Sequence, residues 1–98
     1  MIRYMKEFVA IVEFLEKSDK TRISKGFLIA EKPIIVRMLD NNKYDTADSK
    51  LKLWKAMRWI DAEDRRVTKR IYDGESQTYK PCIKIDLKVA ETMKKHLK

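Results

Sequence analysis

The stretch ADSKLKLWKAMRWIDAEDRRVTKRIYDGESQTYKPCIKI, residues 47–85, decides the fold. In its first part apolar residues recur at helical spacing, and in its second part they alternate with polar residues on either side of a polar turn. A period that changes from about 3.6 residues to about 2 indicates a helix followed directly by two strands. The stretch therefore predicts a helix that leads into an antiparallel β-hairpin.

The helix is expected over residues 47–61. Its buried stripe consists of Ala47, Leu51, Trp54 and Met57, widened by Leu53 and Ile60. The side chains of Asp45 and Thr46 can accept hydrogen bonds from the first free N–H groups, and Asp48 suits the positive end of the helix dipole. Trp54 is expected in the core. Trp59, on the opposite side, either stacks on a ligand or is covered by other parts of the protein.

The hairpin is expected to pair residues 66–72 with residues 78–85 across a turn at 73–77. One parity holds Val67, Ile71, Tyr79, Ile83 and Ile85, and the other holds Arg66, Thr68, Arg70, Lys80 and Lys84. This alternation predicts one packed face and one basic face, with Tyr72 on the basic side and Tyr79 in the packing. Pro81 cannot donate to a strand ladder, so the second strand is expected to lie at an edge or to be irregular there.

Elements on both sides complete a single domain over residues 1–98. Residues 2–17 carry apolar side chains at helical spacing, and the apolar run at residues 27–30 predicts a short strand. Pro33 suits the first turn of a second helix that ends at residues 40–42, and Asp86 can cap a last helix. The expected order is helix, short strand, helix, turn, helix, hairpin, helix, which belongs to the α+β class.

This order resembles the winged helix-turn-helix superfamily over almost the whole chain. The second and third helices correspond to the helix-turn-helix, and the hairpin corresponds to a two-stranded wing. The resemblance rests on element order and charge placement rather than on a diagnostic motif, and it implies a DNA-binding protein whose third helix enters the major groove. Small winged helices occur in regulators and in accessory proteins of plasmids, phages and transposable elements. The chain also has some likeness to relaxosome accessory proteins of clostridial conjugative plasmids.

Positive charge is concentrated in the second half of the chain. The 98 residues have a formal net charge of +8 and a pI of about 9.6. Residues 1–49 hold nine Lys/Arg and eight Asp/Glu, whereas residues 50–98 hold fourteen Lys/Arg and seven Asp/Glu, a net charge of +7. Such polarised basic charge is typical of proteins that bind the phosphate backbone, although excess lysine also promotes solubility. Double-stranded DNA is therefore the expected partner.

Two sets of residues are predicted to contact DNA. The hairpin set is Arg65, Arg66, Thr68, Lys69, Arg70, Lys80 and Lys84. The set on the third helix is Ser49, Lys50, Lys52, Lys55, Arg58 and Trp59. An arginine fork can bond O6 and N7 of guanine at once, so Arg66 and Arg70 are the expected base readers. The residues expected to neutralise phosphates are Lys52, Lys55, Arg65, Lys69 and Lys80. Asp48 would repel phosphates at the start of the helix, so docking by the helix and docking by the wing both stay open.

Catalysis and cofactor binding find little support in the sequence. The one histidine, His96, lies near the end of the chain, and the one cysteine, Cys82, has no histidine near it in sequence. A single cysteine allows no intrachain disulfide and no cysteine-based metal cluster, and two glycines cannot build the usual phosphate-binding loop. No apolar run is long enough for a signal peptide or a membrane span. We expect a cytoplasmic protein that is not an enzyme and needs no cofactor or metal.

The expected role is transcriptional regulation, or origin binding as an accessory factor in plasmid conjugation or mobile-element transfer. A homodimer on repeated half-sites would suit either role. The alternative is a protein–protein interaction module or inhibitor encoded by a mobile element. RNA binding also stays open, although the aromatic strand motif of RNA-recognition modules is missing.

Overall fold

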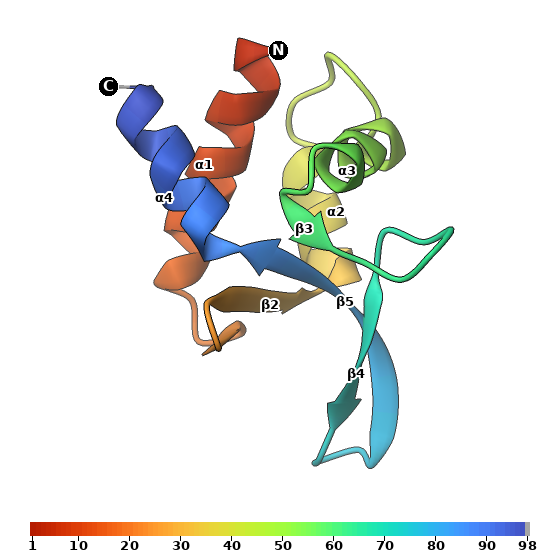
Figure 1. Ribbon diagram of the computed structural model, residues 1–98. Coiled ribbons are helices and arrows are strands. Elements are labelled where there is room, and N and C mark those ends of the chain that lie inside the picture. Colours follow the sequence, from red (N-terminus) through yellow and green to blue (C-terminus); the bar gives the residue numbers. More distant parts are fainter. Residues whose placement is uncertain (98) are drawn as a thin grey trace.

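The computed structural model describes residues 1–97, which form four helices and a five-stranded antiparallel sheet in an α+β arrangement. The elements in chain order are α1 (Ile2–Glu16), β1 (Arg22–Ser24), β2 (Phe27–Glu31), α2 (Lys32–Leu39), α3 (Ala47–Ala56), β3 (Ile60–Asp61), β4 (Lys69–Asp73), β5 (Thr78–Asp86) and α4 (Leu87–His96). All four helices lie on one side of β2 and β5, whereas the β4–β5 hairpin extends away from them (Figure 1).

The long strand β5 organises the sheet. Its second half pairs with β2 along one edge, where Cys82 lies opposite Glu31 and Ile85 opposite Leu28. Its other edge pairs first with β4 and then with β3, so that Cys82 also faces Lys69 and Ile85 also faces Ile60. Strand β1 adds to the far edge of β2. One strand therefore belongs both to the body of the domain and to the projecting hairpin.

The core lies between the helices and the face of the sheet that carries Leu28, Ile83 and Ile85, all of which are fully buried. Phe8 of α1 lies at the centre of this core, with its ring centroid 4.9 Å from that of Trp54 and 5.0 Å from that of Trp59. Large buried aromatic side chains contribute much of the hydrophobic free energy of a small domain. The expected core position of Trp54 is confirmed.

Several local signals lead to the expected elements. Pro33 lies in the first turn of α2, the Thr46 hydroxyl accepts a hydrogen bond from the Ser49 N–H at 3.1 Å, and Asp86 caps α4. The β1–β2 hairpin was not predicted. It closes through Lys25 and Gly26, whose φ angles of 51° and 84° suit the tight two-residue turns that match strand twist.

Helix α3 ends at Ala56, five residues before the predicted end. Arg58 has a φ angle of +61°, and the Trp59 N–H donates to the Trp54 carbonyl at 2.8 Å while the Arg58 N–H donates to the Lys55 carbonyl at 3.0 Å. These two bonds form a Schellman motif, which turns the chain sharply out of the helix. Met57, predicted in the buried stripe, is consequently 47% exposed.

The predicted strand at residues 66–72 is also corrected, because β4 begins only at Lys69. On β5, Lys84 pairs with Asp61 and Cys82 pairs with Lys69, so only Ile83 lies between the two paired positions. Residues 62–68, seven in number, cannot all pair with that one residue and loop out of the sheet. We call residues 62–68 the basic loop, since they include Arg65 and Arg66.

None of the helices in residues 1–97 combines the length and hydropathy that a membrane-spanning helix requires.

Candidate functional site

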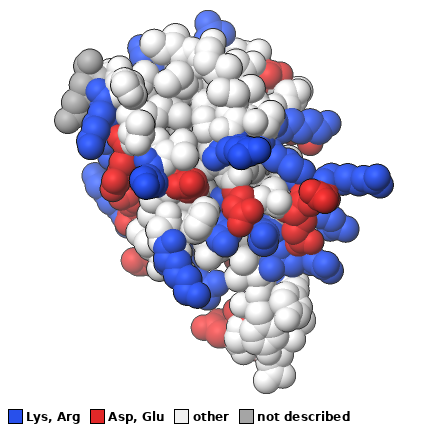
Figure 2. Space-filling view, in the orientation of Figure 1, with Lys and Arg blue, Asp and Glu red and all other residues white. Residues whose placement is uncertain are grey.

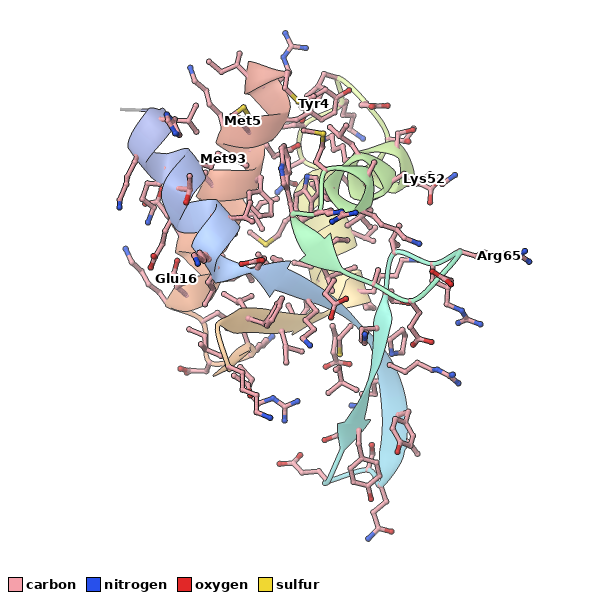
Figure 3. The ribbon with its side chains drawn as sticks, viewed as in Figure 1. Tyr4, Met5, Glu16, Lys52, Arg65 and Met93 are labelled. Carbon is pink, nitrogen blue, oxygen red and sulfur yellow. The ribbon has the colours of Figure 1, made fainter. Side chains whose placement is uncertain are left out.

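A basic groove of about 540 Å³ lies where α3, the start of α2 and the basic loop meet β5. Its lining residues are Lys32, Asp48, Lys52, Lys55, Arg65, Arg66, Val67, Thr68 and Pro81. Five of them are cations and one is a carboxylate, so the groove is strongly positive. Lys52 from α3 and Arg65 from the basic loop extend on the same side of the molecule (Figure 3).

Helix α3 forms one wall of the basic groove. Lys52 and Asp48 are one turn apart and form an exposed ion pair at 2.9 Å, so the carboxylate near the helix start is partly neutralised. Lys55 is half-buried and donates from Nζ to the Glu63 carbonyl at 2.9 Å. This bond ties α3 to the basic loop and sets the width of the groove at that point.

The basic loop forms the second wall and is closed by its own hydrogen bonds. The Glu63 N–H donates to the Thr68 carbonyl at 3.0 Å, and the Arg66 N–H donates to the Glu63 carbonyl at 3.1 Å. Arg65 lies between these contacts with a φ angle of +64°, a left-handed conformation that is costly for a side-chain-bearing residue. A strained arginine at the tip of a closed loop is a feature common at functional sites.

Arg65 and Arg66 are the cations most available to a ligand. Both are exposed, and neither forms a salt bridge within residues 1–97. Lys and Arg side chains, with some Asp and Glu among them, line the right-hand edge of the molecule in Figure 2, and the tip of the hairpin below them shows little charge. The cations therefore gather around the basic groove rather than at the hairpin tip.

Those predicted hairpin cations that do lie on β4 and β5 are instead paired with carboxylates. Lys69 and Lys84 both contact Asp61, at 3.4 Å and 3.3 Å. Arg70 lies 3.4 Å from Glu63, whose pKa is lowered mainly by the hydrogen bond from the Arg70 backbone N–H. Two carboxylates thus offset part of the charge of these three cations, so in the described residues this part of the hairpin is less basic than expected.

The positive charge of Lys80 is also paired with carboxylates. Its Nζ lies 3.1 Å from Asp73 and 3.8 Å from Glu31, and the hydrogen bond to Asp73 raises the pKa of Lys80. The pKa of Asp73 is lowered to about 2, first by the hydrogen bond from the Ser76 hydroxyl and then by the one from Lys80. These contacts hold the 73–77 turn in one conformation.

The strand register also corrects the predicted faces of the hairpin. Arg70 lies opposite Pro81, whereas Lys80 lies opposite Ile71. Directly opposed residues share a face, so Arg70 and Lys80 project from opposite faces. The prediction placed all even-numbered residues of both strands on one face. It failed because each even-numbered residue of β4 pairs with an odd-numbered residue of β5. Arg66, predicted to share the face of Arg70, lies in the basic loop and not on the hairpin.

Lys50, predicted to contact DNA, is fully buried. Its Nζ donates to Glu7 Oε2 at 3.1 Å, to the Leu39 carbonyl at 2.8 Å and to the Asn42 carbonyl at 2.6 Å. Tyr44 donates its hydroxyl to Glu7, and burial together with this bond raises the pKa of the phenol. Lys50 therefore fastens the turn between α2 and α3 to α1 and is unavailable to a ligand.

Trp59 is likewise buried: it is only 5% exposed because the turn after α3 places it against Phe8. Thr68 is 5% exposed at the inner end of the basic loop, where it lines the basic groove. Ser49 and Arg58 are exposed as predicted, but both lie outside the basic groove. Lys32 was missed, because its closeness to the basic loop arises only from the tertiary fold.

A second hollow of about 430 Å³ is mainly apolar and lies along α4 beside α1. Its lining residues are Met5, Asp86, Lys88, Val89, Thr92, Met93 and His96. In residues 1–97 no group of three or more His, Cys, Asp or Glu side chains is arranged to hold a metal ion. Cys82 is buried, and burial raises the pKa of its thiol, which disfavours the reactive thiolate.

In comparisons with known proteins, no protein-family model matches the chain and a search of curated proteins finds no match.

Proposed function

We propose that this protein binds double-stranded DNA through the basic groove and that the fold works as a winged helix-turn-helix. The observation that carries the proposal is the convergence of Lys32, Lys52, Lys55, Arg65 and Arg66 on one groove. They come from two helices and a closed loop, so the backbone brings them to one side of the molecule. A cluster of cations on one surface suits the phosphate backbone of a duplex.

The topology supports the assignment of roles. Helices α2 and α3 are joined by residues 40–46, and the Lys50 network holds this connection against α1. Strand β2 lies between α1 and α2 in the chain and pairs with β5, which follows the helices. In this proposal α3 is the helix nearest the DNA and the β4–β5 hairpin is the wing. The basic loop supplies the arginines that a simple wing would carry on its strands.

The electrostatics favour the helix and loop over the hairpin for phosphate contact. Exposed ion pairs contribute little to stability, so the Lys52–Asp48 pair can open and let Lys52 meet a phosphate. Within residues 1–97, Arg65 and Arg66 form no salt bridge that would have to open. The proposed biological setting is transcriptional control, or loading at an origin of plasmid or mobile-element transfer, in the cytoplasm.

The experiment is fluorescence anisotropy with a labelled duplex over a series of salt concentrations. If about five phosphates are neutralised, log K should fall with log salt with a slope of about −4.5. The double variant R65A/R66A should bind much more weakly, and the magnitude of its slope should fall by about 2. Lys6 and Lys95 are exposed on α1 and α4, away from the groove, so K6A/K95A removes the same charge as a control.

Two results would contradict the proposal. One is the absence of duplex binding by the wild type at low salt. The other is an equal loss of affinity in R65A/R66A and K6A/K95A, because that would show a response to net charge alone.

The apolar hollow along α4 favours a second candidate function, a protein-interaction module that joins two copies of this chain. Met5, Val89 and Met93 line the hollow, and apolar surface of this kind is stabilised when a partner covers it. Sedimentation velocity of the wild type and of V89E tests this function. A concentration-dependent dimer that V89E abolishes would support it, and a monomer at all concentrations would exclude a self-association role.

A further inference from the structure

The β4–β5 hairpin carries an exposed aromatic face that the basic groove does not use. Tyr72 and Tyr79 are opposed across the strands, so their rings share the face that carries Arg70 and Pro81. The two ring centroids are 5.3 Å apart at an interplanar angle of 68°. Tyr72 is 50% exposed and Tyr79 is 68% exposed. Two large rings fixed against each other are thus presented to solvent.

Nothing in the described structure covers this face. The strand partner β2 ends at Glu31, opposite Cys82, and the hairpin continues beyond it away from all four helices (Figure 1). Residues 71–79 contain Asp73 and Glu75 but no Lys or Arg. The end of the hairpin is therefore slightly acidic and aromatic, which is the opposite of the basic groove.

This composition is unsuited to phosphate contact. In a continuous duplex the minor groove is about 6 Å wide and lies between two phosphate backbones, so Glu75 would be repelled on insertion. Each base inside a duplex already has both faces stacked on its neighbours. Exposed aromatic rings stack most readily on unpaired bases, and such stacking binds single strands with little regard to sequence.

The aromatic face is continuous with the basic groove. Pro81 lines the basic groove and shares the hairpin face with Tyr79. Arg70 and Tyr79 line a neighbouring hollow of about 440 Å³ together with Glu63 and Lys69. In Figure 3 Arg65 extends from the basic loop on the side of the molecule from which the hairpin departs. A nucleic acid held in the groove can pass directly onto the rings.

We propose that Tyr72 and Tyr79 form a stacking platform for unpaired bases, so that the preferred ligand is duplex DNA with an adjoining single-stranded segment. This inference rests on the proposed duplex binding by the basic groove. The groove holds the phosphates of the paired part, and the platform receives the bases of the unpaired part. The hairpin then distinguishes the structure of the DNA rather than its sequence.

The test compares three labelled probes by anisotropy. They are a blunt duplex, the same duplex with a short oligothymidine tail, and the same duplex with a tail of abasic sites. The abasic tail keeps the added phosphates and removes the base faces, so it isolates stacking from charge. The wild type should bind the thymidine-tailed probe about tenfold more tightly than the abasic one.

Because a cross-strand aromatic pair contributes up to about 1 kcal/mol, urea unfolding first checks that each variant is fully folded under the binding conditions. Y72A/Y79A should bind both tailed probes equally while its affinity for blunt duplex equals that of the wild type. Y72F/Y79F should keep the preference, because stacking requires the rings and not the hydroxyls.

The platform proposal is wrong if the wild type binds the two tailed probes with equal affinity. It is also wrong if Y72A/Y79A loses as much affinity for the blunt duplex as for the thymidine-tailed probe. If the proposed duplex binding by the basic groove is itself wrong, the result is different, because the wild type then does not bind the blunt duplex at low salt.

Discussion

The Lys50 ammonium and the Glu7 carboxylate form a buried ion pair, 3.1 Å apart, that joins α3 to α1. Burying two charges costs several kcal/mol of desolvation free energy, which their attraction offsets only when the remaining hydrogen bonds are satisfied. Here the Leu39 and Asn42 carbonyls accept from the same ammonium, and Tyr44 and Asn42 donate to the carboxylate. The pair thereby fixes the turn that positions α3.

Removing the ammonium should be strongly destabilising. K50A leaves the Glu7 carboxylate buried without its cation and removes one donor from each of the Leu39 and Asn42 carbonyls, so the free energy of unfolding should fall by about 3–5 kcal/mol. The double variant E7L/K50M, which replaces both charges by apolar groups, should be less destabilised than K50A. Urea unfolding measures all three proteins. A change of less than about 1 kcal/mol in K50A would show that the network does not hold the turn.

Replacing Arg65 by glycine should weaken duplex binding without a large change in the free energy of unfolding. Its φ of +64° costs little for glycine, so in R65G the relief of strain should offset the greater freedom of the unfolded chain. We expect the free energy of unfolding of R65G to stay within about 1 kcal/mol of the wild type, while duplex affinity falls. Urea unfolding and anisotropy on the same preparation check this. A large stability loss would mean that the side chain supports the loop.

The tryptophans should report folding and not ligand binding. Trp54 is fully buried and Trp59 is 5% exposed, so both indoles are shielded from water. The native protein should therefore emit at short wavelength and resist quenching by acrylamide, and saturating duplex DNA should leave the emission wavelength unchanged. Efficient acrylamide quenching of one indole in the native state would show that Trp59 leaves the core.

The hairpin turn should weaken in strong acid. Hydrogen bonds from Ser76 and then Lys80 lower the pKa of Asp73 from 3.8 to about 2, so the folded state favours its ionised form. The resulting stabilisation is complete above pH 3.8 and is lost as the pH falls through about 2. Amide exchange at Glu75, measured by NMR from pH 5 to pH 2, should show reduced protection at the acid end.

The matched variant for the acid prediction is D73N. It should have reduced protection at Glu75 at every pH, because a neutral amide cannot supply the same charge. If the wild type keeps its protection at pH 2, the carboxylate does not hold the turn.

Periodicity in the sequence predicted most elements but not their exact ends. The caps at Thr46 and Asp86 and the proline of α2 act within one turn of chain, so they were visible in the sequence. The end of α3 was not, because the left-handed position of its C-terminal motif is filled by Arg58 instead of the usual glycine. Trp59 therefore looked like a surface residue of a longer helix.

The sequence predicted that the candidate site is rich in cations, but it did not predict where in the fold each of them lies. Arg65, Arg66, Lys52 and Lys55 were named in advance and lie together in the groove. Lys50 was misjudged because its partner Glu7 is 43 residues away, and no local pattern connects them. The basic loop was hidden because residues 66–68 continue the alternation of the strand that follows, whereas the register of β5 leaves them no partners.

The position of β5 has a consequence for the order in which the protein is made. A nascent chain that has emerged as far as residue 77 already contains every cation of the basic groove. It lacks the strand with which β2, β3 and β4 all pair. The groove can therefore take shape only after residues 78–86 leave the ribosome, and until then its cations lack the sheet that arranges them.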